Sequence, residues 1–276
     1  MAPIDCQKLA RFLRRNIWDR VPEDQRERFK YEFIPGVLAH FKSGALRIET
    51  FGPFAGDEEG QRIIDGLVGI NAFRRTELCE LMRIVGSDKG LSRHNYTAVY
   101  ASLFAGLRSR PLRFFELGIG TNNPALPSTM GAAGRPGASL RGWSRFFPEA
   151  QIFAADIDRQ ILFREPRITT FFCDQTNPDS VRALWSAPEL GDDFDVIVED
   201  GLHTFEANLV FLEGSLHKLK RSGLYIIEDV SNSDLPRWRD LLSRDGPVRH
   251  DHSYCIATIP WITTIDNSLV IARRAP

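Results

Sequence analysis

Short apolar runs alternate with longer amphipathic stretches from about residue 96 onward. Each run is four to six residues long and ends at turn-forming or charged residues, a pattern typical of buried parallel strands. The runs are residues 112–117, 151–155, 168–173, 195–198 and 224–227. Residues 205–221, closed by Gly223, have the pattern of a connecting helix. A strand–helix–strand unit brings the carboxyl ends of its strands to one edge of a sheet. We therefore predict an α/β fold with a Rossmann-like, mostly parallel sheet.

An antiparallel hairpin is predicted at the end of this sheet. Residues 254–259 and 268–273 have the sequence pattern of two strands, and they flank a turn at Asp266 and Asn267. Before the first parallel strand, residues 96–107 have the pattern of a helix. These elements complete one large α/β domain, which we place at residues 87–276.

The chain before residue 87 has a mainly helical pattern. Helical spacing is present at three segments and strand-like alternation at one. The helical segments are residues 7–17, 23–41 and 58–84, and the strand-like one is 45–51. We predict that residues 1–86 form an auxiliary region that covers the site, binds substrate or forms an oligomer surface.

Composition limits the classes of partner. The 276 residues are 43% hydrophobic and carry a net charge of −1, which disfavours binding to nucleic acid or to an anionic membrane. No stretch approaches the roughly 18 apolar residues of a membrane span, and charges interrupt the first residues, where a signal peptide would be apolar. The four cysteines form no C-x-x-C pair, as expected of reduced thiols. We therefore expect a cytoplasmic protein that acts on a small molecule.

Glycines follow the first parallel strand. Gly118 and Gly120 allow backbone to pass close to a ligand at the strand's carboxyl end. A dinucleotide fingerprint is incomplete, because its third glycine is replaced by Asn123 and Asp156 lies 36 residues after Gly120, where about 20 is expected (156 − 120 = 36). These departures argue against NAD. Residues 122–141 are rich in Gly, Pro and Ser, which predicts either an inserted loop over the pocket or a solvent-exposed loop away from it.

Acidic residues close three successive strands. Glu116 ends the first, Asp156 follows the second and Asp174 follows the third. This arrangement suits a nucleoside pocket, in which Asp156 binds ribose hydroxyls and Asp174 with Gln175 meets an adenine amine. The alternative for Asp174 is that it caps a helix beginning near residue 178.

A second acidic group follows the last two parallel strands. Asp200, Glu228 and Asp229 should converge at one sheet edge, and three carboxylates form a hard oxygen site that suits Mg²⁺, or Mn²⁺ or Ca²⁺. His203 could take a proton near neutral pH from a hydroxyl held there. Alternatively, Asp200 and Asp229 are helix N-caps. Glu199, one residue before Asp200, should face away from it.

Nine short segments of the chain together resemble a known family. They are residues 87–90, 94–96, 116–121, 138–141, 147–148, 156–158, 174–175, 200–203 and 228–229. The family is the class I S-adenosylmethionine-dependent methyltransferases, and within it the metal-dependent sugar O-methyltransferases of macrolide antibiotic biosynthesis. The resemblance covers about two thirds of the chain. It implies Asp200, Glu228 and Asp229 as metal ligands and His203 as the general base. It also implies cofactor contacts, at Glu116, Gly118, Gly120, Tyr96, Ser139, Asp156, Asp158, Asp174 and Gln175.

The predicted function is a Mg²⁺-dependent transfer of a methyl group from S-adenosylmethionine to a hydroxyl of a sugar or glycosylated natural product. The alternatives are an NAD-type oxidoreductase or epimerase and a non-catalytic nucleoside-binding module. The resemblance suggests a homo-oligomer, although polar helices in residues 7–41 also suit a monomer.

Overall fold

The structure, a computed structural model, describes residues 17–26, 29, 44–54, 56–90, 94–244, 246, 248, 250–260 and 267–276. The predicted helix at residues 7–17 lies outside this part except for its last residue. The predicted helix at 23–41 is described only at its start, where η2 (Glu23–Gln25) is a single 3₁₀ turn preceded by η1 (Trp18–Arg20). Asp266 of the predicted hairpin turn is also outside the described residues.

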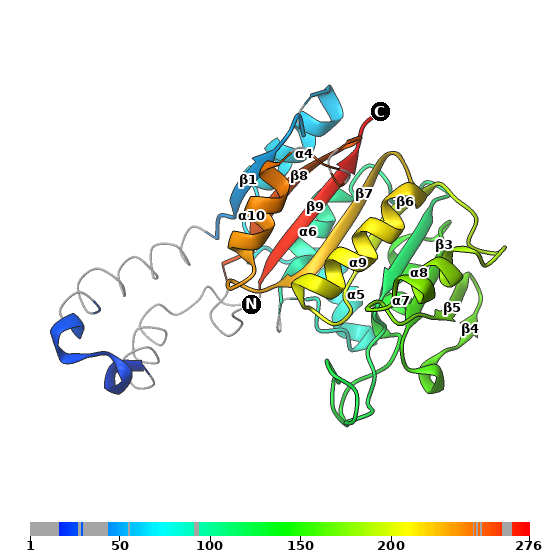
Figure 1. Cartoon of the computed structure of the whole chain (residues 1–276), viewed down its shortest axis with the longest axis horizontal. Coiled ribbons are helices and arrows are strands. Elements are labelled where there is room, and N and C mark those ends of the chain that lie inside the picture. Colours follow the sequence, from blue (N-terminus) through cyan, green and yellow to red (C-terminus); the bar gives the residue numbers. More distant parts are fainter. Residues whose placement is uncertain are drawn as a thin grey trace.

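The described residues form one nine-stranded sheet in the order β1-β8-β9-β7-β6-β2-β3-β5-β4 (Figure 1). Strands β2, β3, β5, β6 and β7 are mutually parallel, whereas β1, β4, β8 and β9 pair antiparallel with their neighbours. The prediction of a mostly parallel core with an antiparallel C-terminal hairpin is confirmed. The strands are β1 (Arg47–Phe51), β2 (Arg113–Leu117), β3 (Gln151–Asp156), β4 (Arg164–Glu165), β5 (Ile168–Phe172), β6 (Phe194–Glu199), β7 (Leu219–Val230), β8 (His252–Thr258) and β9 (Ser268–Arg274).

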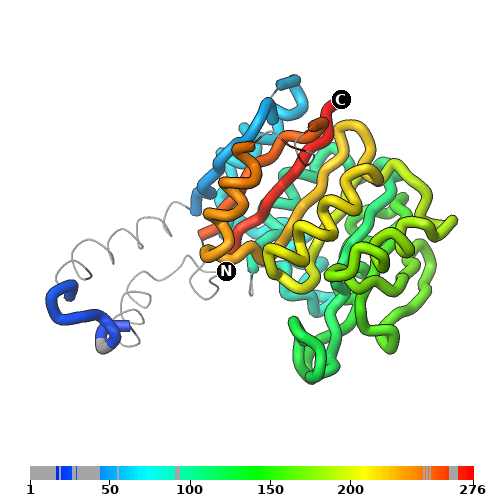
Figure 2. Tube along the Cα trace, in the orientation of Figure 1, coloured from blue at the N-terminus to red at the C-terminus, as the bar shows by residue number. Residues whose placement is uncertain are grey.

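Helices cover both faces of the sheet (Figures 1 and 2). One face packs on α4 to α7 around Trp143, and the other packs on α8 to α10 around Trp185 and Trp238. Aromatic rings fill both layers, because sheet faces covered by helices are apolar on both sides. The helices are α4 (Glu58–Val68), α5 (Glu77–Val85), α6 (Tyr96–Leu103), α7 (Ala138–Phe146), α8 (Pro178–Trp185), α9 (Phe205–Ser215) and α10 (Leu235–Ser243).

The predicted helix at 205–221 is too long. Helix α9 ends at Ser215, η5 (Leu216–Lys218) follows, and β7 begins at Leu219. The start of β7 is polar because it lies before a register shift against β6, where Lys220 forms an ion pair with Asp195 at 2.9 Å. Gly223 does not close a helix but lies within the strand, with a main-chain carbonyl of the neighbouring strand 3.0 Å from where a Cβ would be.

Two other predicted boundaries are corrected. The loop prediction at 122–141 included the first turn of α7, which begins after Gly137 in the left-handed conformation (φ 71°). The helical pattern at 58–84 forms two helices, α4 and α5, and the second has Thr76 as its N-cap. In both segments, local turn geometry at Gly, Thr or Asn residues sets where the helix begins or ends, and the hydrophobic pattern does not reveal it.

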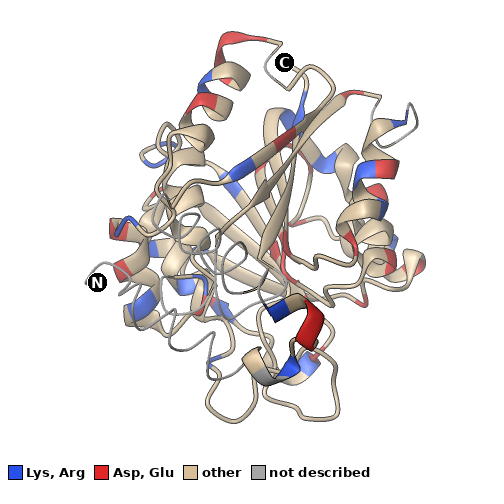
Figure 3. Ribbon diagram, turned by 90° about the vertical axis from the view of Figure 1, so that its left-hand side faces the viewer, with Lys and Arg blue, Asp and Glu red and all other residues tan. Residues whose placement is uncertain are grey.

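The described part of the N-terminal region joins the main sheet. The predicted strand at 45–51 is confirmed as β1, which pairs with β8, and α4 packs on the same face as α6. The division between residues 86 and 87 stays a prediction. Charged residues of both signs are spread over the outer helices and loops (Figure 3). Among the described residues, no helix has the length and apolar character needed to cross a membrane, and Cys79, Cys173 and Cys255 are buried free thiols.

Candidate active site

The strand order reverses between β2 and β6, and the backbone segments that follow these two strands pass unusually close to each other. Gly118 has φ 82°, and a Cβ there would lie 1.9 Å from the main-chain oxygen of Asp200. The Asp200 N–H donates to the Leu117 carbonyl at 2.8 Å, and the Gly118 N–H donates to Ala155 at the same distance. Only glycine fits this crossing, which opens the crevice that α/β sheets use for ligands.

A cavity of about 990 Å³ lies at this crevice. It is lined by ten of the predicted site residues and is large enough for a nucleoside cofactor together with part of an acceptor. Three predicted residues, Glu116, Tyr96 and Asp158, lie behind its wall, so their contact with a cofactor stays a prediction. The ten on the wall are Gly118, Gly120, Ser139, Asp156, Asp174, Gln175, Asp200, His203, Glu228 and Asp229.

Asp156 and Asp158 shape the glycine-containing loop. The Asp156 carboxylate accepts the N–H groups of Ile119 at 2.8 Å and Asp158 at 2.9 Å. Asp158 in turn accepts the hydroxyl of Thr121 at 2.5 Å. Burial raises the pKa of Asp156, and these N–H donors oppose the shift. The predicted ribose contact of Asp156 stays a prediction, and its carboxylate reaches the cavity from the correct strand end.

Asp174 does not cap a helix, so that alternative is wrong. The N-cap of α8 is Asn177, whose side chain accepts the Asp179 N–H at 2.9 Å. Asp174 instead accepts the hydroxyl of Thr176 at 2.7 Å and faces the cavity with Gln175.

Lys89 joins three carboxylates beneath the cavity. Its ammonium lies 2.5 Å from Asp200 Oδ2, 2.5 Å from Glu228 Oε2 and 3.2 Å from Glu116 Oε1, and only 2% of its side chain is exposed. Burial alone would lower the pKa of Lys89, but the three carboxylates hold it well above its usual value. Burial raises the pKa of Glu116, whose other oxygen accepts the Trp143 indole N–H at 2.7 Å.

The first turns of α6 also contact the acidic group. The hydroxyls of Tyr96 and Tyr100 donate to Asp229 and Glu228, respectively. His94 stacks on Tyr96, and its Nδ1 lies 3.1 Å from Asp229 Oδ1. Glu228 therefore has both oxygens occupied, by Lys89 and by Tyr100.

Asp200, His203 and Asp229 converge on the cavity. His203 Nε2 lies 3.1 Å from Asp200 Oδ1 and 3.6 Å from Asp229 Oδ2, and one ligand atom from each residue lies within 4.8 Å of the others. Burial opposes protonation of His203, but the hydrogen bond and charge of Asp200, together with the charges of Asp229 and Glu228, raise its pKa to about 9. His203 and Asp229 have φ of 61° and 52°, left-handed conformations that non-glycine residues adopt when their surroundings hold them.

The capping alternative for the two aspartates is also wrong. The N-caps of α9 and α10 are Thr204 and Asp234, so neither Asp200 nor Asp229 caps a helix. The prediction that Glu199 faces away from Asp200 is confirmed. Its carboxylate accepts the Tyr225 hydroxyl at 3.0 Å on the opposite face, and burial raises its pKa to about 8.

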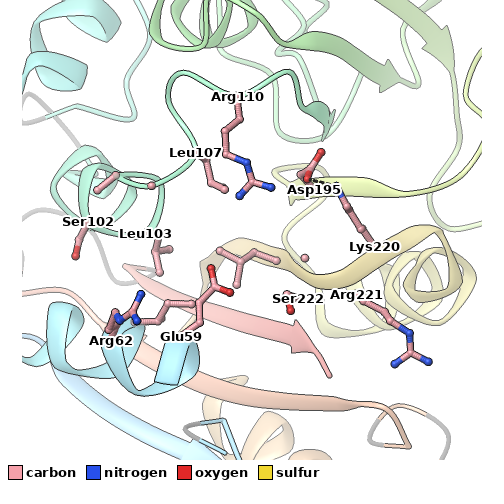
Figure 4. A pocket seen from close by; sticks show the side chains of 15 residues that line it. Glu59, Arg62, Ser102, Leu103, Leu107, Arg110, Asp195, Lys220, Arg221 and Ser222 are labelled. Carbon is pink, nitrogen blue, oxygen red and sulfur yellow. Dashed lines mark hydrogen bonds and ion pairs between the residues drawn. The ribbon is translucent and has the colours of Figure 1, made fainter. Parts of the chain in front are cut away.

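A second cavity, of about 350 Å³, lies at the opposite edge of the sheet (Figure 4). Asp195 and Lys220 form an ion pair on its wall, while Arg110 extends over it from the loop after α6. Arg62, on its α4 side, is paired with Glu58 at 3.1 Å. The Asp195–Lys220 pair lies at the start of the parallel strands β6 and β7, at the end opposite to Asp200 and His203.

Sequence reasoning did not assign roles to Lys89, His94 or Tyr100. Lys89 and His94 lie in segments that support the family resemblance, but a lysine or tyrosine in a short motif carries no signal of burial. Only the folded arrangement, with α6 packed behind β7, brings them to Glu228 and Asp229.

Known proteins similar to this chain are named as methyltransferases. An 8-demethyl-8-α-L-rhamnosyl tetracenomycin-C 2′-O-methyltransferase of Streptomyces olivaceus is 36% identical over 162 residues, covering 58% of this chain and 39% of that protein. An 8-demethyl-8-(2-methoxy-α-L-rhamnosyl)-tetracenomycin-C 3′-O-methyltransferase of the same organism is 31% identical over 185 residues, or 67% of this chain and 44% of that protein. The chain thus spans about two fifths of the length of these relatives. No protein-family model matches the chain.

A solved structure has the same fold. The MycE methyltransferase of the mycinamycin biosynthetic pathway, in complex with Mg, SAH and mycinamycin VI, aligns with a TM-score of 0.56 and 21% identity. The alignment covers 74% of this chain and 56% of MycE.

The strand order and the alignment with MycE show that the chain has a class I methyltransferase fold. The relatives that it matches in sequence are named as O-methyltransferases of rhamnosyl tetracenomycin-C compounds.

Proposed function

We propose that the chain transfers a methyl group from S-adenosylmethionine to a hydroxyl of a sugar or glycosylated natural product, with a divalent cation, Mg²⁺ in the first instance. The observation that supports this best is the convergence of Asp200, His203 and Asp229 on one cavity, next to the Gly118 crossing. A methyl-donor pocket and an acid–imidazole group in one cavity are what this reaction needs.

The residues fit a hard divalent cation. Asp200 and Asp229 present carboxylate oxygens to the cavity, and no thiol is among the clustered groups found in the described part of the chain. Three carboxylates, those of Glu116, Asp200 and Glu228, share the buried ammonium of Lys89, and Asp229 adds a fourth carboxylate beside His203. A site rich in carboxylate oxygens favours Mg²⁺, which when bound would supply Lewis acidity toward an acceptor hydroxyl.

The other end of the cavity fits a nucleoside. Gly118 and Gly120 keep the backbone close to the cavity, Asp156 and Asp174 offer carboxylate oxygens at successive strand ends, and Gln175 lies on the same wall. Bound S-adenosylmethionine would supply an electrophilic methyl group. The chain contributes mainly alignment of the acceptor oxygen with that methyl, an orientation effect.

His203 serves as the general base in this proposal. Asp200 orients its ring through the 3.1 Å contact, and the carboxylates of Asp200 and Asp229 hold its pKa near 9. An imidazole with that pKa is protonated at neutral pH. His203 can therefore accept a proton only when a bound cation offsets the charge of the neighbouring carboxylates. Proton removal would then depend on the presence of that cation.

The two alternative functions have less support. An NAD-type oxidoreductase or epimerase does not account for the carboxylates around His203, and its glycine fingerprint is incomplete at Asn123. A non-catalytic nucleoside-binding module needs neither His203 nor Asp229.

Calorimetric titration distinguishes the cofactors. S-adenosylhomocysteine should bind the purified chain with a Kd in the micromolar range, and NAD⁺ should give no heat of binding under the same conditions. Each titration is repeated after chelation of divalent cations. Binding of NAD⁺ without binding of S-adenosylhomocysteine would contradict the proposal and direct the search to redox chemistry.

Metal affinity separates the two neighbouring acids of β7. Asp229→Asn should weaken Mn²⁺ binding, measured by calorimetry, more than Glu228→Gln does, because Glu228 is already bonded to Lys89 and Tyr100. The Glu228 variant should lose about 10- to 100-fold, as is typical when a group that supports the ligands is changed. Equal losses in both variants would show that Glu228 is a direct ligand, as the family resemblance implies.

The acceptor and the cellular setting are proposals of the same kind. The sugar-bearing substrates in the names of the relatives suggest a glycosylated small molecule as the acceptor. We also propose a cytoplasmic location and a homo-oligomer in which the first helices take part. Size-exclusion chromatography with light scattering would test the oligomer directly.

A further inference from the structure

Gln175 makes contacts that a role in cofactor binding does not require. Its side chain is 7% exposed and lies on the cavity wall after β5. Its Oε1 accepts the N–H of Leu202 at 2.7 Å, and its Nε2 donates to Glu199 Oε1 at 2.9 Å. Leu202 immediately precedes His203, so one hydrogen bond links the nucleoside end of the cavity to the turn that carries the imidazole.

The same turn is packed against Gln175 without a gap. A Cβ on Gly201 would lie 1.8 Å from Gln175 Oε1, and the three nearest atoms all belong to Gln175. On the other side, a Cβ on Gly118 would lie 1.9 Å from the main-chain oxygen of Asp200. The turn at residues 200–203 is therefore held between β2 on one side and the Gln175 amide on the other.

Gln175 is itself fixed from the core. Glu199, at the end of β6, is 1% exposed, and its second oxygen accepts the Tyr225 hydroxyl at 3.0 Å. His203 needs such support, because it has a left-handed backbone conformation without being glycine. The contacts run in an unbroken series from Tyr225 through Glu199 and Gln175 to the turn.

We propose that Gln175 is a positioning residue, which fixes the turn that carries His203. The consequence for turnover rests on the proposed function, since that assigns the proton transfer to His203. The contact between Gln175 and Leu202 does not depend on it. By this inference, Gln175 on the nucleoside side of the cavity also positions His203.

Replacement of Gln175 by methionine tests the inference, because Met keeps the length of the side chain and removes both amide groups. Gln175→Met should lower kcat by on the order of 10², the effect of a slightly misplaced catalytic group. The KM for S-adenosylmethionine and the Kd for S-adenosylhomocysteine should change little. Hydrogen exchange of the Leu202 amide, followed by NMR, should become about tenfold faster, equivalent to one net hydrogen bond.

The matched control is Gln160→Met, in which an exposed glutamine in the turn after β3 receives the same substitution. It should alter neither kcat nor Leu202 exchange. An unchanged Leu202 exchange rate in Gln175→Met would overturn the inference. So would weaker S-adenosylhomocysteine binding with an unchanged kcat, which would make Gln175 a cofactor contact only. If the wild type methylates no glycosylated acceptor, the proposed function fails, while Leu202 exchange still decides the role of Gln175.

A pair of small substitutions gives a second test if Gln175→Met does not fold. Gly201→Ala should lower kcat, because its methyl group displaces the turn from Gln175. In a Gln175→Ala background the same change should cost little, since the space is vacated, and the two effects should therefore not add. An equal loss from Gly201→Ala in both backgrounds contradicts the inference.

Discussion

His203→Ala should lower kcat for methyl transfer by about 10²- to 10⁴-fold, the usual contribution of a positioned general base. The imidazole of His203 lies on the cavity wall and contacts Asp200 at 3.1 Å, where it can take the proton of an acceptor hydroxyl. Its removal leaves the nucleoside end of the cavity intact, so the Kd for S-adenosylhomocysteine should stay unchanged. Rates are measured at saturating acceptor and S-adenosylmethionine.

His250→Ala is the matched control for this variant. The His250 side chain is 86% exposed and pairs only with its neighbour Asp251, at 3.0 Å, among the contacts that the structure describes. Its removal should leave kcat unchanged. If His203→Ala retained full turnover, the proton would have to leave by another group, and His94, 3.1 Å from Asp229, would be the next candidate.

The convergence of the site could be predicted because it follows from strand direction alone. Residues that follow parallel strands meet at one edge of the sheet, so Asp156, Asp200 and Asp229 could be placed together from the ends of three apolar runs. Strand alternation likewise predicted that Glu199 faces the other way. Neither inference requires knowledge of side-chain packing.

The partners of these acids could not be predicted in the same way. Lys89 lies in a loop before α6, and whether a lysine there is solvated or buried depends on how α6 and α7 pack on the sheet. The position of Tyr100 behind Glu228 has the same origin. The early start of β7 was missed because its first residues are polar, which is the pattern of a helix end as much as of a strand outside the core.

The bond between Gln175 and Leu202 was missed for another reason. The sequence places Gln175 at a strand end, where an adenine contact is the natural expectation, and a side chain that also bonds the neighbouring turn leaves no trace in the pattern. The folded structure reveals it, through the 2.7 Å hydrogen bond from the Leu202 N–H and the lack of space for a Cβ between Gly201 and the Gln175 amide. Glycines with no evident turn role are thus a useful sign of close packing at such sites.

Lys89→Met should destabilise the chain by about 3–5 kcal/mol at neutral pH, the cost of removing one partner from a buried charge pair. The variant keeps the apolar volume of the side chain but leaves Glu116, Asp200 and Glu228 without their shared cation. Urea unfolding of the metal-free protein measures the change. Lys218→Met is the control, because its partner Asp192, at 2.5 Å, has a side chain that is 68% exposed and stays solvated without the ammonium, so the loss should be much smaller.

The loss caused by Lys89→Met should depend on pH in a defined direction. Without the ammonium, burial and mutual repulsion keep the pKa values of Glu116 and Glu228 high, and their protonation on acidification relieves the unpaired charge. The destabilisation should therefore be larger at pH 8 than at pH 5. Added Mg²⁺ should restore part of the stability, because the variant's site has still more negative charge to offset. A loss equal at both pH values, and no larger than that of Lys218→Met, would mean that Lys89 does not carry the charge balance of the site.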